Sequence, residues 1–265
     1  MVLSRFALTD RVAIVTGAGR GIGRGIALGL AQAGAHVVVA ARTAADLENI
    51  AGEIHKVGRR ALSVPTDVRD SGQIANMVER TMTEFGKIDI LVNNAGGFSI
   101  RPVLQMPEEL WDAIMGKNLR SVFLCCKAVG AVMVEQRRGS IINISSAGAG
   151  FPDPEAAHYG AAKAAINSLT QSLAVEWGPY GVRVNTLSPG LVQTPGADYE
   201  HLGGPEMIKV RLQAIALRRV GTPEDLVGAA IFLASDASAY VTGANILVHG
   251  GYLPFHERLL MEGSS

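Results

Sequence analysis

The sequence is poor in cysteine, in aromatic residues and in charge of a single sign, and it has no long uninterrupted apolar run. Of its 265 residues, 2 are cysteines and 5% are aromatic. Lysine and arginine together number 24, as do aspartate and glutamate, so the formal net charge is zero. A balanced charge disfavours proteins that bind nucleic acid or an anionic membrane surface. Glycine and charged residues interrupt the apolar runs, so we expect no membrane-spanning helix.

The two cysteines, Cys125 and Cys126, are adjacent and fall in an apolar helical pattern. Cysteines in such a pattern predict core packing rather than a disulfide framework or a metal site. Residues 1–10 contain no long apolar stretch and do not resemble a secretory signal. We therefore expect a protein of the reducing cytoplasm that binds no metal.

What the sequence does contain is a regular alternation of short β-branched runs with longer helical patterns. The predicted strands are 11–15, 35–40, 61–66, 88–92, 140–145, 183–187 and 246–248. The predicted helices are 21–33, 43–57, 71–85, 107–136, 159–177 and 223–235. Several strands are apolar throughout, as parallel strands covered on both faces are. The alternation predicts an α/β fold with a doubly wound parallel sheet of about seven strands and helices on both faces.

No internal linker breaks the pattern, so we expect one domain over residues 1–265. The one long excursion, 191–220, follows a strand end and becomes helix-like around 206–217. Connections of this length are usually functional, and open α/β sheets bind ligands at this edge. We expect 191–220 to be a substrate-binding lid and 252–265 a C-terminal tail. A surface insertion and a frayed terminus are the alternatives.

A glycine-rich loop lies between the first predicted strand and the first predicted helix. Its sequence is Thr16-Gly17-Ala18-Gly19-Arg20-Gly21-Ile22-Gly23. Glycine lets backbone N–H groups approach an anion, and the helix N-terminus adds roughly half a positive charge. The spacing of Gly17, Gly21 and Gly23 is GxxxGxG, not the GxGxxG of other dinucleotide folds. Tight turns also need glycine, but this position between strand and helix favours a dinucleotide phosphate site.

The second predicted strand ends in Ala41-Arg42-Thr43 and offers no carboxylate. A dinucleotide site holds the adenosine ribose there with an acidic or a basic residue. Ala41 cannot accept hydrogen bonds from a ribose diol, whereas Arg42 and Arg20 can face a 2′-phosphate. Both arginines are alternatively ordinary surface charges. The missing acid favours NADP(H), with NAD(H) as the alternative.

Tyr159 and Lys163 are four residues apart, which places a phenol and an ammonium on one face of a helix. An unperturbed tyrosine has a pKa near ~10. A nearby ammonium favours the phenolate, as does the positive nicotinamide ring of an oxidised cofactor, so we expect both to lower the pKa of Tyr159. The pair gains weight because four strand ends carry small, polar or turn residues, which predicts one continuous crevice. These ends are the glycine loop, Asn93-Asn94-Ala95-Gly96, Ser145-Ser146-Ala147-Gly148 and Ser188-Pro189-Gly190.

Together these motifs, in this order, resemble the short-chain dehydrogenase/reductase family over residues 12–251. The motifs are Thr16-Gly17 to Gly23, Asp67-Val68, Asn93-Asn94-Ala95-Gly96, Asn118, Ser146, Tyr159-x-x-x-Lys163 and Pro189-Gly190. The resemblance implies a Rossmann-like sheet of strand order 3-2-1-4-5-6-7. It also implies an NAD(P)(H)-dependent oxidoreductase that interconverts a carbonyl and a secondary alcohol by hydride transfer.

The resemblance also implies roles for individual residues. Tyr159 is the general acid/base, Ser146 binds the carbonyl oxygen, and Lys163 bonds the nicotinamide ribose. Asn118 holds a water that links Lys163 to solvent. The implied cofactor contacts are Gly17, Gly19, Arg20, Gly21, Ile22, Gly23, Arg42, Asp67, Val68, Asn94, Ala95, Gly96, Tyr159, Lys163, Pro189, Gly190, Val192 and Thr194.

Two departures from the family pattern lie near the C-terminus. His249-Gly250-Gly251 stands where the family usually has Asp-Gly-Gly, and the tail then continues to residue 265. The family commonly forms dimers and tetramers, so the tail is expected either to dock on a neighbouring subunit of a homo-oligomer or to fray. The other functions left open are an enoyl-thioester reductase and a non-catalytic nucleotide-binding regulator. The sequence does not select the substrate.

Overall fold

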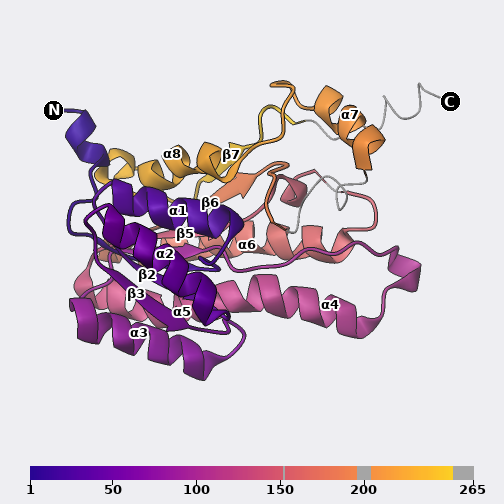
Figure 1. Ribbon diagram of the computed structural model, residues 1–265. Coiled ribbons are helices and arrows are strands. Elements are labelled where there is room, and N and C mark those ends of the chain that lie inside the picture. Colours follow the sequence, from indigo (N-terminus) through magenta and orange to yellow (C-terminus); the bar gives the residue numbers. More distant parts are fainter. Residues whose placement is uncertain (152, 196–203, 253–265) are drawn as a thin grey trace.

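The computed structural model describes residues 1–151, 153–195 and 204–252, without the side chains of 205–207 (Figure 1). Its strands are β1 (Val12–Thr16), β2 (His36–Ala41), β3 (Ala61–Pro65), β4 (Ile90–Asn93), β5 (Gly139–Ile144), β6 (Val182–Pro189) and β7 (Asn245–Val248). Its α-helices are α1 (Gly21–Gln32), α2 (Ala44–Lys56), α3 (Ser71–Phe85), α4 (Glu108–Met115), α5 (Ser121–Gln136), α6 (Ala157–Trp177), α7 (Gly204–Ala214) and α8 (Pro223–Ala234).

The seven strands form one parallel sheet in the order β3-β2-β1-β4-β5-β6-β7, which confirms the expected topology. The predicted strands overlap the observed ones with ends that differ by one or two residues. Two apolar cores lie on the two faces of the sheet. Helices α1, α2 and α8 contribute to the core on one face, and α3, α5 and α6 to the core on the other. The central strands β1, β2, β4 and β5 therefore run between two apolar layers, which explains why their sequences do not alternate, whereas the edge strand β7 is partly exposed.

The predicted helix 107–136 is wrong in one respect. The chain is helical over this range, but α4 and α5 are joined by a π-helical turn over Gly116–Arg120. Such a turn adds a residue to the hydrogen-bonded ring, and π-turns are frequent at functional sites. Asn118 lies inside it and is buried.

Cys125 and Cys126 are both buried in the core below α5, as predicted. Burial raises the pKa of the Cys125 thiol to about 12 and that of Cys126 further still. Among the described residues no group of acidic, histidine and cysteine side chains is placed to hold a metal ion. Within the same residues, no helix combines the length and the hydropathy needed to cross a membrane.

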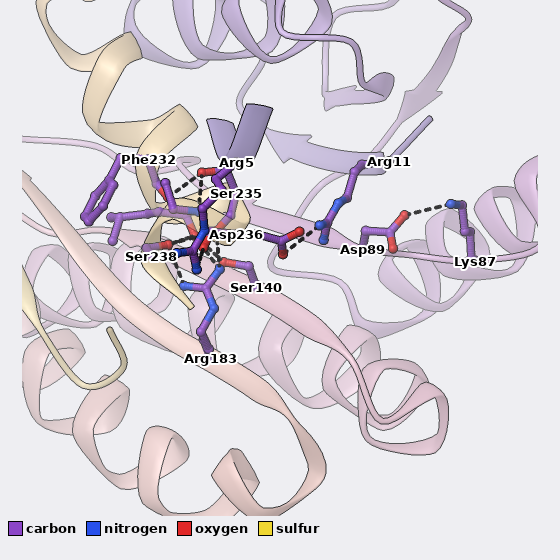
Figure 2. Close-up of polar contacts among 12 residues, drawn as sticks. Arg5, Arg11, Lys87, Asp89, Ser140, Arg183, Phe232, Ser235, Asp236 and Ser238 are labelled. Atoms are coloured by element: carbon purple, nitrogen blue, oxygen red, sulfur yellow. Dashed lines mark hydrogen bonds and ion pairs between the residues drawn. The ribbon is translucent and has the colours of Figure 1, made fainter. Parts of the chain in front are cut away.

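A cluster of polar side chains lies at the amino ends of the strands, which is the edge of the sheet opposite to the glycine loop. Figure 2 shows its side chains. The Arg183 guanidinium donates to the carbonyl oxygens of Leu233, at 2.8 Å, and Ser235, at 3.2 Å, at the end of α8. Arg11 donates to Asp236 at 2.8 Å. The orphan carbonyls of a helix end are thereby satisfied, which fixes α8 against the sheet.

Candidate active site

A large cleft lies at the carboxyl ends of the strands and has a volume of about 1620 Å³. Parallel strands of a doubly wound sheet bind ligands at this edge. All the predicted site residues except Gly23 line it, and they are Gly17, Gly19, Arg20, Gly21, Ile22, Arg42, Asp67, Val68, Asn94, Ala95, Gly96, Asn118, Ser146, Tyr159, Lys163, Pro189, Gly190, Val192 and Thr194. The structure therefore brings together residues that are up to 177 positions apart in the chain.

The glycine loop after β1 is held from behind by Asn94. Gly17 has a φ of +65°, and a Cβ there would lie 2.8 Å from Asn94 Nδ2. The Asn94 amide donates to the carbonyl oxygens of Thr16 at 3.0 Å and Gly17 at 3.1 Å. Gly23 lies behind the loop rather than in the cleft, because a Cβ there would stand 2.3 Å from the Gly17 carbonyl oxygen. Glycine at both positions keeps the loop thin and closely packed, as a cradle for a pyrophosphate requires.

At the end of the cleft that Arg42 lines, Asp67 forms an ion pair with Arg69 at 2.5 Å. The hydrogen bond from Arg69 lowers the pKa of Asp67 to about 2, and the charge of Arg42 contributes in the same direction. Arg42 and Arg20 are exposed and line the cleft. Arg69 was not predicted, because residues two apart carry no pairing signal in a loop.

At the other end of the cleft, Ser146, Tyr159 and Lys163 lie together. Ser146 follows β5 and accepts a hydrogen bond from the Gly148 N–H at 3.1 Å. The Lys163 ammonium lies 5.5 Å from the centre of the Tyr159 ring, so the predicted common face of α6 is confirmed. Lys163 is 5% exposed and donates to the Ile144 carbonyl oxygen at 2.8 Å.

The expected lowering of the pKa of Tyr159 by Lys163 and an oxidised nicotinamide stays a prediction, because other causes act on Tyr159 in the structure itself. Burial raises the pKa of Tyr159, its contact with the Ser146 hydroxyl lowers it, and the charge of Asp153 raises it. Lys163 stands over the ring, and its ammonium donates to a strand carbonyl. Burial also lowers the pKa of Lys163 to about 8.

The amide of Asn118 clamps the chain that follows β4. It donates to the carbonyl oxygens of Gly97 at 2.9 Å and Ile114 at 3.0 Å, and it accepts from the Gly97 N–H at 3.2 Å. The π-turn places this side chain opposite Gly97 instead of further round the helix. The role of Asn118 in holding a water beside Lys163 stays a prediction.

The chain after β6 returns across the glycine loop. A Cβ on Gly21 would meet the Thr194 side chain at 3.2 Å, and Val192 pairs with Gly221 in an isolated bridge. The predicted lid is described in part: helix α7 falls within 191–220 and begins two residues before the predicted helix, whereas residues 196–203 lie outside the described chain. Of the predicted tail, Tyr252 alone is described, and it pairs with Ile215.

Several side chains of the cleft were not predicted. Phe98 meets the Tyr159 ring edge to face, with centroids 5.0 Å apart and an interplanar angle of 89°. Phe151 meets His249, with centroids 6.4 Å apart. The remaining unpredicted side chains that line the cleft near its reactive end include Ile100, Lys117, Asp153, Glu155, Arg211 and Tyr252. The loops that carry Ile100, Asp153 and Glu155 have no periodic pattern from which a side chain's direction follows.

Comparison with known proteins agrees with this geometry. Residues 17–253 match a family model described as enoyl-(acyl carrier protein) reductase. The 3-oxoacyl-[acyl-carrier-protein] reductase of a Synechocystis species is 41% identical over 94% of this chain and 99% of its own.

Two solved structures extend the similarity to three dimensions. A short-chain type dehydrogenase/reductase from Mycobacterium marinum superposes with a TM-score of 0.86 at 39% identity, over 95% of this chain and 98% of that one. A 3-oxoacyl (acyl-carrier-protein) reductase from Agrobacterium tumefaciens C58 with NADP bound has a TM-score of 0.88 at 33% identity, over 94% and 96%. The chain therefore belongs to the short-chain dehydrogenase/reductase family and is an NAD(P)-dependent oxidoreductase that interconverts carbonyls and alcohols.

Proposed function

We propose that this protein is an NADP(H)-preferring carbonyl reductase in which Tyr159 is the general acid. The observation that carries the proposal is the grouping of Ser146, Tyr159 and Lys163 at one end of a cleft whose other end is the glycine loop. When bound, the nicotinamide cofactor supplies or accepts the hydride. The thin loop held by Asn94 fits a pyrophosphate, because Gly17 has no side chain that would collide with Asn94 behind the loop and displace its backbone N–H groups.

The proton chemistry follows from the environment of Tyr159. Because burial raises its pKa, Tyr159 stays protonated at neutral pH and can donate its proton to a carbonyl oxygen. Ser146 already accepts from the Gly148 N–H, so its own hydroxyl proton remains available to the same carbonyl oxygen. Lys163 uses one of its three donors on the Ile144 carbonyl and keeps two for ribose hydroxyls.

Replacing Tyr159 by phenylalanine tests this assignment. We expect Tyr159→Phe to abolish NADPH-dependent reduction of carbonyls while leaving the dissociation constant of NADPH within about twofold. The ring is retained, including its contact with Phe98, and the proton donor alone is lost. Turnover near the wild-type rate would contradict the mechanism.

The proposed preference for NADP(H) rests on two arginines, Arg20 and Arg42, which are exposed and line the cleft. It also rests on the lack of an acidic residue at the end of β2. A charge-assisted hydrogen bond is worth roughly 1.5–3 kcal/mol, so we expect Arg42→Ala to weaken NADPH binding about 10- to 100-fold and NADH binding little. Arg24→Ala is the matched control, since Arg24 is paired with Glu53 at 2.6 Å and does not line the cleft. Equal weakening of both nucleotides would overturn the preference.

An enoyl-thioester reductase is the second candidate, because the matching family model carries that description. Consumption of NADPH with a ketone, an alcohol plus NADP, and an enoyl thioester separates the two. Faster reduction of the enoyl thioester than of every ketone would select the second candidate. Absence of all turnover would select a nucleotide-binding regulator.

The remaining proposals concern assembly and place. We propose a homodimer or homotetramer of the 27.8 kDa chain in the cytoplasm, with residues 191–220 as the substrate lid of a single domain. Small-molecule carbonyls and alcohols are the proposed partners. Light scattering of the purified protein measures the oligomeric state directly.

A further inference from the structure

Two apolar side chains that follow β4 face the reactive end of the cleft. Phe98 and Ile100 line the cleft, whereas Ser99 between them does not. The Ser99 hydroxyl instead bonds Nε2 of the buried His158 at 2.8 Å. This alternation is that of an extended chain, whose successive side chains point to opposite sides.

Two hydrogen bonds hold this segment, one from Ser99 between Phe98 and Ile100 and one from Arg101 directly after them. The Ser99–His158 bond joins it to α6 at the residue directly before Tyr159. The Arg101 N–H donates to the Glu155 carbonyl oxygen at 2.7 Å, which joins it to the loop before α6. The positions of Phe98 and Ile100 relative to Tyr159 are therefore set by the fold.

The exposure of the Phe98 and Ile100 side chains inside the cleft favours an apolar ligand. Phe98 is 60% exposed and Ile100 is 58% exposed. Adjacent exposed apolar side chains inside a cleft are typical of ligand-binding surfaces, and here one of them touches the Tyr159 ring. A flat apolar ring seated on Phe98 would cover it and bring its carbonyl close to Tyr159.

Two further aromatic residues, Phe151 and Tyr252, line the same cleft, and both contact His249. The Phe151 ring contacts the imidazole edge to face. His249 Nδ1 accepts from the Tyr252 N–H at 3.1 Å, which fixes the backbone at Tyr252. The residue that departs from the family's usual aspartate thus supports an aromatic part of the wall.

Charge at the reactive end opposes an anionic substrate. Asp153 and Glu155 line the cleft there, and the charge of Asp153 acts on the Tyr159 hydroxyl. A substrate carboxylate or phosphate held near that hydroxyl would meet repulsion. The cations Lys117 and Arg211 also line the cleft, but the charge of neither is among those that shift the pKa of Tyr159.

We propose that Phe98 and Ile100, together with Phe151 and Tyr252, form a recognition surface for an uncharged alicyclic or aromatic ketone. The inference rests on the proposed function and names its substrate class. This surface disfavours carboxylated polyol ketones, because they offer no ring to the wall and bring negative charge to the acidic end. It disfavours acyl thioesters because they offer no ring to the wall.

Binding measured without turnover tests the surface. The Tyr159→Phe protein saturated with NADPH is titrated calorimetrically with trans-1-decalone, 5-keto-D-gluconate and acetoacetyl-coenzyme A. We expect decalone to bind at least tenfold more tightly than the other two. In the same background, Phe98→Ala should weaken decalone binding about 10- to 100-fold, as the loss of a large apolar contact does. Phe98→Leu should retain most of the affinity.

Leu104→Ala is the matched control, because Leu104 is fully exposed shortly after this segment and does not line the cleft. It should change no dissociation constant by more than about twofold. Tighter binding of either anionic ketone, or equal weakening of all three ligands by Phe98→Ala, would overturn the surface. Failure of the wild-type protein to reduce any ketone would instead count against the proposed function, while the binding order would still decide the recognition surface.

Discussion

Replacing Lys163 by methionine should make the protein more stable at neutral pH while abolishing its activity. Lys163 is 5% exposed, and burial lowers its pKa from 10.5 to about 8. At ~1.4 kcal/mol for each pKa unit, the folded state disfavours the charged side chain by about 3 kcal/mol. Methionine removes this penalty and has a similar length, so it fills the same space beside β5.

The substitution also has a cost, because Lys163 is the partner of the Ile144 carbonyl oxygen. A buried carbonyl that loses its donor costs roughly 1–3 kcal/mol. The net expectation for Lys163→Met at pH 7 is a gain of about 1 kcal/mol in the free energy of unfolding. For a chain of this size that gain raises Tm by about 2–4 °C.

The pH dependence identifies the cause. Between pH 8 and 10.5 the unfolded chain binds the Lys163 proton and the folded chain does not, so wild-type stability rises with pH in this window. From pH 7 to pH 10 the wild-type protein should gain about 2–3 kcal/mol that Lys163→Met does not gain. Urea unfolding at both pH values, followed by circular dichroism, measures the difference, in which all other titrating groups cancel. A variant that is less stable at pH 7, or that has the wild-type pH slope, would refute the reasoning.

Three further outcomes are expected. Gly130→Ala should destabilise the protein and shift the fluorescence of Trp177, because the new Cβ would stand 2.5 Å from the indole ring; an unchanged spectrum would contradict this packing. Arg183→Met should lower the free energy of unfolding by about 2–4 kcal/mol without changing KM, since it removes the charged hydrogen bonds to the Leu233 and Ser235 carbonyl oxygens far from the cleft; urea titration and kinetics check both parts. Cys125 and Cys126 should not react with a disulfide reagent at pH 8 until the protein unfolds, because both thiols are buried and their pKa values are raised.

The sheet could be predicted because the apolar sequence of its central strands indicates that they are buried on both faces. β1 and β5 are buried throughout and largely apolar, and few folds accommodate such runs between helical patterns. The strand order, however, came from the resemblance to a family. The pairing of Lys163 with Ile144 could not be predicted, because a strand carbonyl near a helix is set by how the two elements pack.

The features that were missed share a physical reason. The π-turn around Asn118 continues the helix from α4 into α5 without a break, so the pattern over 107–136 does not reveal it. The direction of Phe98 depends on the bond between Ser99 and His158, which are 59 residues apart. The expected effect of Lys163 on the pKa of Tyr159 followed from their spacing, whereas the burial that raises this pKa depends on how α6 packs against the rest of the chain.

The two edges of the sheet divide stability from function. At the amino edge, the polar groups of Arg183 and the end of α8 satisfy one another (Figure 2), so substitutions there act on folding alone. At the carboxyl edge, Lys163 is buried although burial disfavours its charged form, and the apolar side chains of Phe98 and Ile100 are exposed. Each of these costs stability, and each becomes favourable when a cofactor and a substrate occupy the cleft. Stabilising substitutions found at the carboxyl edge, such as Lys163→Met or Phe98→Ser, should therefore impair ligand binding or turnover, and an edge substitution that improves both would break this division.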